Sequence, residues 1–242
     1  MKSSFIAVLV GLVSIGVTSA EPAKPPVPEE EIVNRYLDAT QEQQTALRGG
    51  SMEVDIDARL PKRKMHGTLH ALRNISKLGR ITYHMLGFNG DNTVKTEVIA
   101  RYLSAEVQAS QGQDSPNLGI TPENYKFRYK GLEDLNGRDT YVLRVTPRQK
   151  KVGLFKGELW LDAETYMPVR ESGSFVKTPS VFLKKIQFVR NYMMQNGVSV
   201  PQRTESKIEA RFFGPVELDI NYLNFSKENE ADAVTGTLNE PK

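Results

Sequence analysis

Two histidines four residues apart, His66 and His70, have the spacing in this sequence that is most like that of a metal site. On a helix, such a pair lies on one face and can share one zinc ion. The residues around them alternate between apolar and polar types, which predicts a strand, and on a strand four residues span about 13 Å. Because one ion cannot bridge that distance, we expect no metal at this pair.

Catalytic groups are equally hard to assemble from this composition. The sequence has three histidines and no cysteine, so a Ser–His or Cys–His nucleophile is not expected. Glu53, Asp55 and Asp57 share the polar face of a predicted strand, where a solvated surface is favoured over a general acid and base. Neither a P-loop nor a G-x-G-x-x-G fingerprint occurs, so we expect no nucleotide cofactor. The sequence therefore favours a binding protein over an enzyme.

Apolar side chains at alternating positions of three predicted strands form a candidate binding surface. If the sheet is curved and its inner face exceeds what two helices cover, these side chains line an apolar cavity. The pattern leaves a fully packed core as an equal alternative. The predicted cavity residues are Met52, Val54, Ile56, Leu69, Ile81, Tyr83 and Met85.

Two helices must accompany these strands. Residues 29–47 carry apolar side chains at spacings of three and four, begin with three glutamates and are followed by Gly49-Gly50, which predicts a helix with a defined end. Residues 93–109 predict a second amphipathic helix, which we expect to act as a movable lid over the concave face. Its predicted lid residues are Val94, Val98, Tyr102 and Leu103.

The rest of the sequence predicts about ten antiparallel strands within one domain, residues 29–226. Asn196-Gly197, between two long strand patterns, is a strong hairpin signal. Because helices are few and occur early in the sequence, the pattern indicates an α+β protein and excludes alternating βαβ units.

The ends of the chain predict export. Lys2, the apolar stretch Phe5–Val17 and the small residues Thr18-Ser19-Ala20 have the pattern of a cleavable signal peptide over residues 1–20. The apolar stretch of about thirteen residues is shorter than the roughly twenty that a membrane-spanning helix needs. We expect a Pro-rich linker at 21–28 and a flexible C-terminal tail at 227–242.

Charge gives weaker guidance. Without the predicted signal peptide, 31 basic and 29 acidic residues remain, a balance that does not favour a nucleic-acid binder. Two basic runs, residues 62–64 and 148–151, fall in predicted loops. Solvated loop tips are favoured there, with contact to anionic lipid head groups as the alternative.

Two adjacent segments resemble a known superfamily. Residues 155–170, FKGELWLDAETYMPVR, are similar to the LWLD-x-ET-x-x-P-x-R stretch of the superfamily that contains the lipoprotein-sorting carrier LolA and the envelope-stress regulator RseB. The preceding residues 129–147, YKGLEDLNGRDTYVLRVTP, resemble a glycine-containing hairpin of the same proteins.

The resemblance implies an open, strongly curved antiparallel sheet, an unclosed barrel, whose concave face is lidded by helices. It implies a periplasmic carrier whose cargo is the acyl chains of lipoproteins or phospholipid, transported towards the outer membrane, with inner- or outer-membrane export components as partners. An RseB-like envelope sensor acting through a protein partner and a ligand-free envelope scaffold are the alternatives. The sequence does not indicate the oligomeric state.

Overall fold

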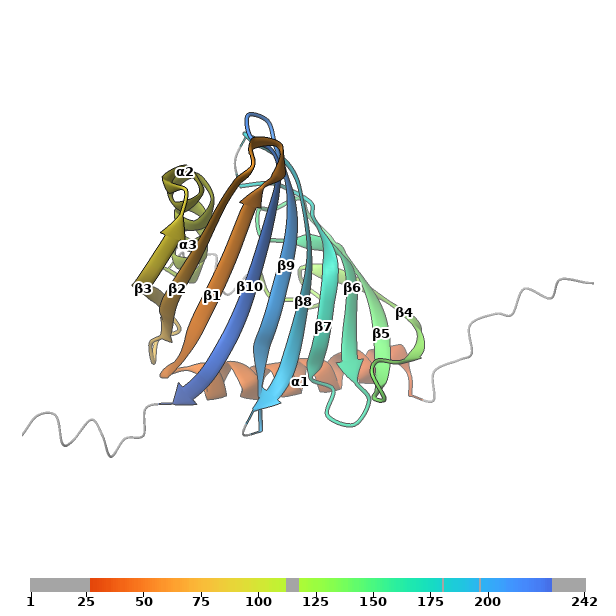
Figure 1. Cartoon of the computed structure of the whole chain (residues 1–242). Helices are drawn as coiled ribbons and strands as arrows, with labels where there is room; N and C mark the ends of the chain where they lie inside the picture. The colour runs from red at the N-terminus through yellow and green to blue at the C-terminus, as the bar shows by residue number, and fades with distance from the viewer. Residues whose placement is uncertain (1–26, 112–117, 180, 196, 228–242) are drawn as a thin grey trace, which may run out of the picture.

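Ten strands of this protein form one antiparallel sheet in the order β3-β2-β1-β10-β9-β8-β7-β6-β5-β4 (Figure 1). The structure, a computed structural model, describes residues 27–111, 118–179, 181–195 and 197–227. The strands are β1 (Gly50–Leu60), β2 (Met65–Ile75), β3 (Ile81–Gly90), β4 (Tyr125–Asp134), β5 (Asp139–Pro147), β6 (Phe155–Asp162), β7 (Pro168–Phe175), β8 (Leu183–Gln195), β9 (Val198–Ala210) and β10 (Gly214–Lys227).

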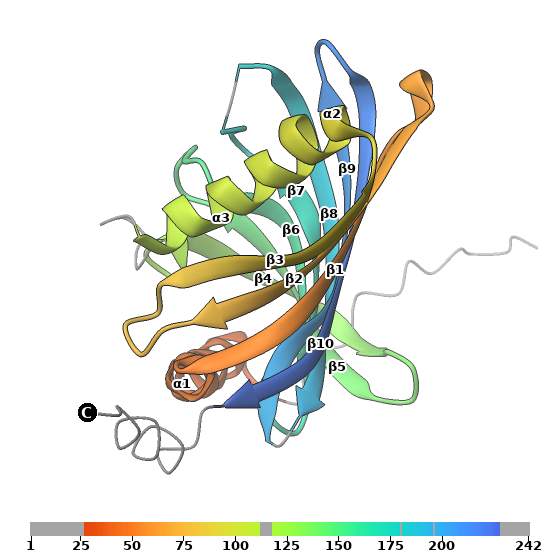
Figure 2. The same ribbon diagram turned by 60° about the vertical axis from the view of Figure 1, so that its left-hand side comes forward.

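The sheet is open, because β3 and β4 stand at its two ends and do not pair with each other. Figure 2 shows that it is strongly curved and that the helical segments lie on its concave side. The predicted α+β class, the strand number and the lidded, unclosed sheet are therefore confirmed. The predicted signal peptide at 1–20, residues 21–26 of the predicted linker and residues 228–242 of the predicted tail lie outside the described residues. So does Asn196 of the predicted hairpin turn.

Strand β1 joins the early strands to the end of the chain. It pairs with β2 on one side and with β10 on the other, so Val54 lies opposite Ala71 and Tyr222. Its side chains alternate between buried and partly exposed positions along the strand. The apolar row therefore faces the concave side, and the acidic row faces solvent.

Helix α1 (Glu29–Leu47) has the predicted bounds. Three glutamates occupy its first turn, where the helix dipole favours anions. Ile32, Val33 and Tyr36 are buried. The chain leaves the helix through Arg48 in an extended conformation and Gly49 at φ 74°, which a glycine adopts without strain.

A second helical segment comprises α2 (Asn92–Val94), the π-helical turn η2 (Lys95–Ile99) and α3 (Ala100–Gln111). We refer to residues 92–111 as the lid segment. It covers the predicted helix 93–109 and lies on the concave side over β1, β2 and β3 (Figure 2). The feature that the sequence did not indicate is the π turn within it.

Two separate apolar clusters result, one under each helical segment. The lid-side cluster joins β1, β2 and β10 to the lid segment. The α1-side cluster joins α1 to β4, β5 and β6 and includes Phe188 of β8. Val27, in the predicted linker, packs against the α1-side cluster.

Two glycines that face each other, Gly157 of β6 and Gly173 of β7, let these strands approach closely beside the α1-side cluster. A Cβ atom at Gly157 would lie 1.9 Å from the carbonyl oxygen of Ser172, so a larger residue cannot be placed there. Phe188 packs edge-on to Phe155, with ring centroids 5.0 Å apart, beside these glycines. Aromatic rings thus fill the space that the missing side chains leave.

Candidate functional site

The deepest row of the predicted cavity wall is packed under the lid segment. Met52, Val54 and Ile56 are each 1% exposed. They form one cluster with Leu69 of β2 and with Val94, Val98 and Ile99 of the lid segment. In this arrangement, the lid segment itself occupies the apolar row where a ligand was predicted.

The remaining predicted wall residues lie on the edge strand β3. The β2–β3 register places Ile81, Tyr83 and Met85 opposite inward-facing positions of β2. Ile81 and Tyr83 are partly buried, whereas Met85 is 49% exposed beyond the cover of the lid. The structure thus puts all seven predicted residues on one face, and their role as a cavity wall stays a prediction.

The two parts of the lid segment are held differently. Val94, Val98 and Ile99, in α2 and η2, are buried. Helix α3 has no buried residue, and its predicted lid residues Tyr102 and Leu103 are only partly buried. The first half of the lid is therefore fixed by fully buried apolar side chains, whereas the second half contributes only the partly buried Tyr102 and Leu103 to the same cluster.

Polar contacts hold the second half of the lid against the sheet. Both Nε and Nη2 of Arg73 donate to Glu106 Oε1, at 3.2 and 2.9 Å. The Tyr83 hydroxyl donates to Glu106 Oε2 at 2.6 Å. We refer to Arg73, Tyr83 and Glu106 as the lid clasp. One turn later, the Ile81 N–H donates to Ser110 Oγ at 3.0 Å.

Burial and mutual attraction set the charge states of the lid clasp. Burial acts to lower the pKa of Arg73, but attraction from Glu106 and neighbouring tyrosines outweighs it, so this pKa is raised. Burial acts to raise the pKa of Glu106, but Arg73 and the hydrogen bond from Tyr83 outweigh it, so that pKa is lowered. The pKa of Tyr83 is raised, first by burial and then by the Glu106 carboxylate. The lid clasp is therefore a charged pair with a neutral tyrosine at neutral pH.

A second polar group lies between the two apolar clusters, on the concave face of β7, β8 and β9. Arg190 lies 3.7 Å from Glu171 and donates through Nε to Thr204 Oγ1 at 3.2 Å. The Tyr192 hydroxyl donates to Glu171 Oε1 at 2.9 Å. We refer to these four residues as the central polar strip.

The central polar strip is enclosed by protein and still reaches solvent. Burial is the largest cause of a strongly raised pKa at Tyr192. Burial acts to lower the pKa of Arg190, but attraction from Tyr192 and Glu171 outweighs it, so this pKa is raised well above its ordinary value. Yet the Arg190 side chain is 34% exposed. A side chain that protein surrounds and solvent still reaches lines a concave surface. The middle of the concave face is therefore lined by polar groups.

Sequence reasoning missed both polar groups, although the spacing contains a signal for them. Arg73 has the same strand parity as Leu69, which places it on the inner face. Glu106 follows Leu103 by three positions and Tyr102 by four, which places it on the inner face of the helix. Arg73 and Glu106 are absent from the predicted cavity wall because an apolar alternation does not indicate polar residues on the same face.

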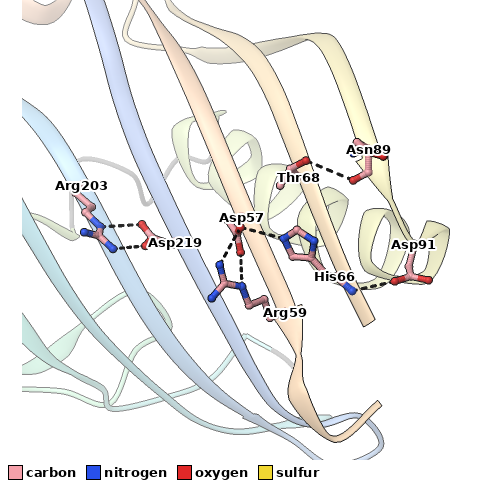
Figure 3. A network of polar contacts seen from close by, with 8 residues as sticks. All are labelled: Asp57, Arg59, His66, Thr68, Asn89, Asp91, Arg203 and Asp219. Carbon is pink, nitrogen blue, oxygen red and sulfur yellow. Dashed lines mark hydrogen bonds and ion pairs between the residues drawn. The ribbon is translucent and has the colours of Figure 1, made fainter. Parts of the chain in front are cut away.

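The opposite, convex face is rich in charged side chains. His66 is on β2, as the sequence predicted, and pairs through Nε2 with Asp57 Oδ2 at 3.0 Å (Figure 3). Asp57 also pairs with Arg59, and Arg203 pairs with Asp219 of the adjacent strand. Within the described residues, no group of three or more His, Cys, Asp or Glu side chains is arranged to hold a metal ion.

A hollow of about 870 Å³ opens on this charged face. Its lining includes Lys156, Arg203, Glu205, Lys207, Glu217 and Asp219. Because basic and acidic side chains are interspersed there and Arg203 pairs with both Glu205 and Asp219, we assign no ligand to it. Among the residues that the structure describes, no helix is long and apolar enough to cross a bilayer.

Known structures similar to this chain include a DUF1329 family protein from Desulfovibrio piger, with 12% identity, a TM-score of 0.49 and coverage of 84% of this chain and 94% of that chain. A LolA superfamily protein from Nitrosomonas europaea has 13% identity, a TM-score of 0.39 and coverage of 86% and 97%. The MucA/MucB complex of Pseudomonas aeruginosa has 13% identity, a TM-score of 0.28 and coverage of 81% and 99%. These include a member of the superfamily that residues 129–170 resemble, and no function follows from similarity at this level. No family model and no curated protein matches the sequence.

Proposed function

We propose that this chain is a periplasmic protein that binds acyl chains of lipoproteins or lipids between its concave face and the lid segment, and carries them towards the outer membrane. The observation that supports this most is the uneven attachment of the lid segment. Its first half is packed into the lid-side cluster, and its second half is held by the lid clasp. The proposed activity is binding, without a catalysed reaction.

The observed arrangement corresponds to the closed state of this proposal. When α3 lifts, Tyr102 and Leu103 leave the lid-side cluster, and an acyl chain can take their place beside the apolar row of β1 and β2. Each buried methylene contributes about 0.8 kcal/mol, so a chain of ten or more methylenes can offset the loss of the lid contacts. Return of the lid fills the row again and expels the cargo.

The π turn at Lys95–Ile99 is the hinge of this proposal. π turns interrupt the regular hydrogen bonding of a helix and often occur at functional positions. Here, the turn contains the last two fully packed lid residues, Val98 and Ile99, and α3 begins directly after it. Helix α3 can therefore move while α2 and η2 remain anchored.

The first experiment is native mass spectrometry of the protein purified from a periplasmic extract, followed by solvent extraction. Its N-terminus, read from the mass, tests the predicted cleavage after residue 20. Co-purified phospholipid or acylated peptide supports the carrier and identifies the cargo class. Bound lipid without transfer between vesicles would instead favour the RseB-like sensor.

One arginine substitution and a matched control locate the binding face. Ile81→Arg places a charge at a partly buried edge position, so we expect a folded protein that has lost its lipid. Thr82→Arg places the same charge at the next position of β3, where the side chain is exposed and points to the opposite face. It should keep its lipid.

Leu69→Arg tests the closed state. Leu69 is 2% exposed, so the substitution buries an unpaired charge and should unfold the protein. The packing of this row also favours a second candidate, a ligand-free envelope scaffold. A mass without ligand that does not change after incubation with lipid vesicles would support the scaffold and contradict the carrier.

A further inference from the structure

Three connections meet at the end of the strands that is remote from α1, as Figures 1 and 2 show. They join β1 to β2, β7 to β8 and β9 to β10. We refer to the basic and apolar residues in and beside these connections as the tip patch. Its members are Lys62, Arg63, Lys64, Val181, Phe182, Lys184, Lys185, Arg211, Phe212 and Phe213.

Direct contacts join the three connections. Arg63 donates to the carbonyl oxygen of Phe212 at 3.1 Å and lies over the Phe213 ring, 4.9 Å from its centroid. Arg211 Nε donates to the carbonyl oxygen of Val181 at 2.8 Å. The rings of Phe182 and Phe212 are 5.3 Å apart. The tip patch is therefore one surface built from three hairpin ends.

Its apolar members are unusually exposed. Val181 is 77% exposed, Phe212 is 66% exposed and Phe182 is 46% exposed. Most of the other aromatic rings in the described residues belong to, or pack against, one of the two apolar clusters. A group of exposed apolar side chains within a rim of charge indicates an interaction surface, because solvent exposure of such groups is unfavourable.

The charged side chains within the tip patch are all basic. Residues 61–64, 181–185 and 211–213 contain six basic residues and no acidic residue. Arg63 and Arg211 donate to main-chain carbonyl groups, and such bonds hold the guanidinium groups without neutralising them. Glu209 lies opposite Lys185 in the β8–β9 register and is the acidic residue closest in sequence to the third connection.

We propose that the tip patch docks this protein on the surface of an anionic lipid bilayer. Phenylalanine rings from two adjacent connections, β7–β8 and β9–β10, can enter the head-group region, while lysine and arginine side chains from all three remain level with the phosphates. Apolar insertion and attraction to anionic lipid are the two terms that drive interfacial binding. This inference goes beyond the proposed cargo binding and does not require the concave face to hold lipid.

The opposite end of β2 offers a matched control. The connection between β2 and β3 has two basic residues, Lys77 and Arg80, on either side of Leu78, which is 77% exposed. It thus has similar chemistry on a single turn, without the aromatic rings. We expect it to contribute little to membrane binding.

The test is co-sedimentation of the periplasmic form of the chain with two kinds of vesicle. One contains phosphatidylcholine alone, and the other contains a mixture of phosphatidylcholine with phosphatidylglycerol. We expect partitioning at least tenfold stronger into the anionic vesicles, falling as salt is raised because salt screens exposed charges. Phe182→Ser/Phe212→Ser and Lys62→Glu/Lys184→Glu should each weaken it at least tenfold, whereas Lys77→Glu/Leu78→Ser should change it less than twofold.

Thermal unfolding of each variant, followed by circular dichroism, excludes loss of fold as the cause of a weaker binding. Equal partitioning of the wild-type chain into both kinds of vesicle, or an equal loss in the control variant, would overturn the proposal. Capture of the chain from an extract by a protein, without sedimentation on pure lipid, would also overturn it. Because vesicle binding and co-purified lipid are measured separately, failure of this proposal and failure of the carrier proposal are distinguishable.

Discussion

The two helical segments of this protein cover the same concave face in different ways. Helix α1 lies on the α1-side cluster and adds a buried polar contact, since Gln43 both donates to and accepts from the main chain of Ser199. The lid segment is packed in its first half and clasped in its second half by Arg73, Tyr83 and Glu106. One helix is thus part of the core, and the other is partly attached to it.

This difference teaches where a curved open sheet can change shape. Apolar packing is roughly proportional to the area that it buries, so a helix with three buried residues in its first half separates there only at high cost. A clasp made of a few polar groups can be exchanged for contacts with water. The proposed carrier would therefore open in the half of the face under α3, while the half under α1 stays closed.

The largest expected effect on stability comes from placing an arginine under each of the two helices, α1 and α3. Ile32→Arg puts a guanidinium at a position of α1 with 0% exposure, and should cost roughly 5 kcal/mol or more, enough to unfold the protein. Leu103→Arg, on α3, should leave the fold intact because this side chain is partly exposed and can turn to solvent. Urea unfolding compares them; equal destabilisation would contradict the difference between the halves.

A smaller effect is expected from neutralising the lid clasp. Glu106→Gln removes the charge that compensates a largely buried Arg73, and should cost about 1–3 kcal/mol. The matched substitution on α1 is Glu31→Gln, which breaks an exposed pair with Arg35 and should not change stability measurably. Amide hydrogen exchange of residues 100–111 should rise in the first variant alone.

Acid should loosen the lid clasp reversibly. The pKa of Glu106 in the folded protein is below its ordinary value of 4.5, so the unfolded chain binds a proton more readily. The stabilisation from this group is therefore complete above pH 4.5 and is lost as the pH falls through the lower folded-state pKa. Amide exchange of α3, compared with the Glu106→Gln variant between pH 6 and pH 3, measures it. An identical pH dependence in both proteins would contradict this assignment.

The smallest expected effect concerns the end of the lid. Ser110→Ala removes the acceptor of the Ile81 N–H and should cost about 0.5–1.5 kcal/mol. Ser104→Ala changes an exposed serine of the same helix and serves as the control. The midpoint temperature of thermal unfolding should be lower for Ser110→Ala than for Ser104→Ala, and amide hydrogen exchange at Ile81 should be faster. A larger loss for Ser104→Ala would contradict the role of Ser110.

Much of this fold follows from local sequence. Three glutamates, a helical apolar period and two glycines predict α1 to its end residues, because these features act within one helix. Alternation predicts β1 for the same reason. A local pattern does not indicate which strands pair with each other, so the pairing of β1 with β10 could not be predicted from the residues alone.

The candidate site was predicted in part. The apolar row of β1 and β2 lies where alternation places it, but the middle of the concave face departs from an apolar pattern, since Thr204 and Ser206 of β9 occupy inward positions. The polarity of Thr204 is tolerated because Arg190 of β8 donates a hydrogen bond to its hydroxyl. Such compensation depends on neighbours that are distant in sequence.

The seam between β1 and β10 also governs when this protein can fold. It brings Ser51 within hydrogen-bonding distance of Ser226, 175 positions later. Contacts over such separations make folding slow, because a long stretch of chain must be ordered before they form. The β1–β3 hairpins therefore remain without their central neighbour until almost the entire chain has been synthesised. A slow, late-closing sheet therefore leaves one edge of β1 open until β10 arrives.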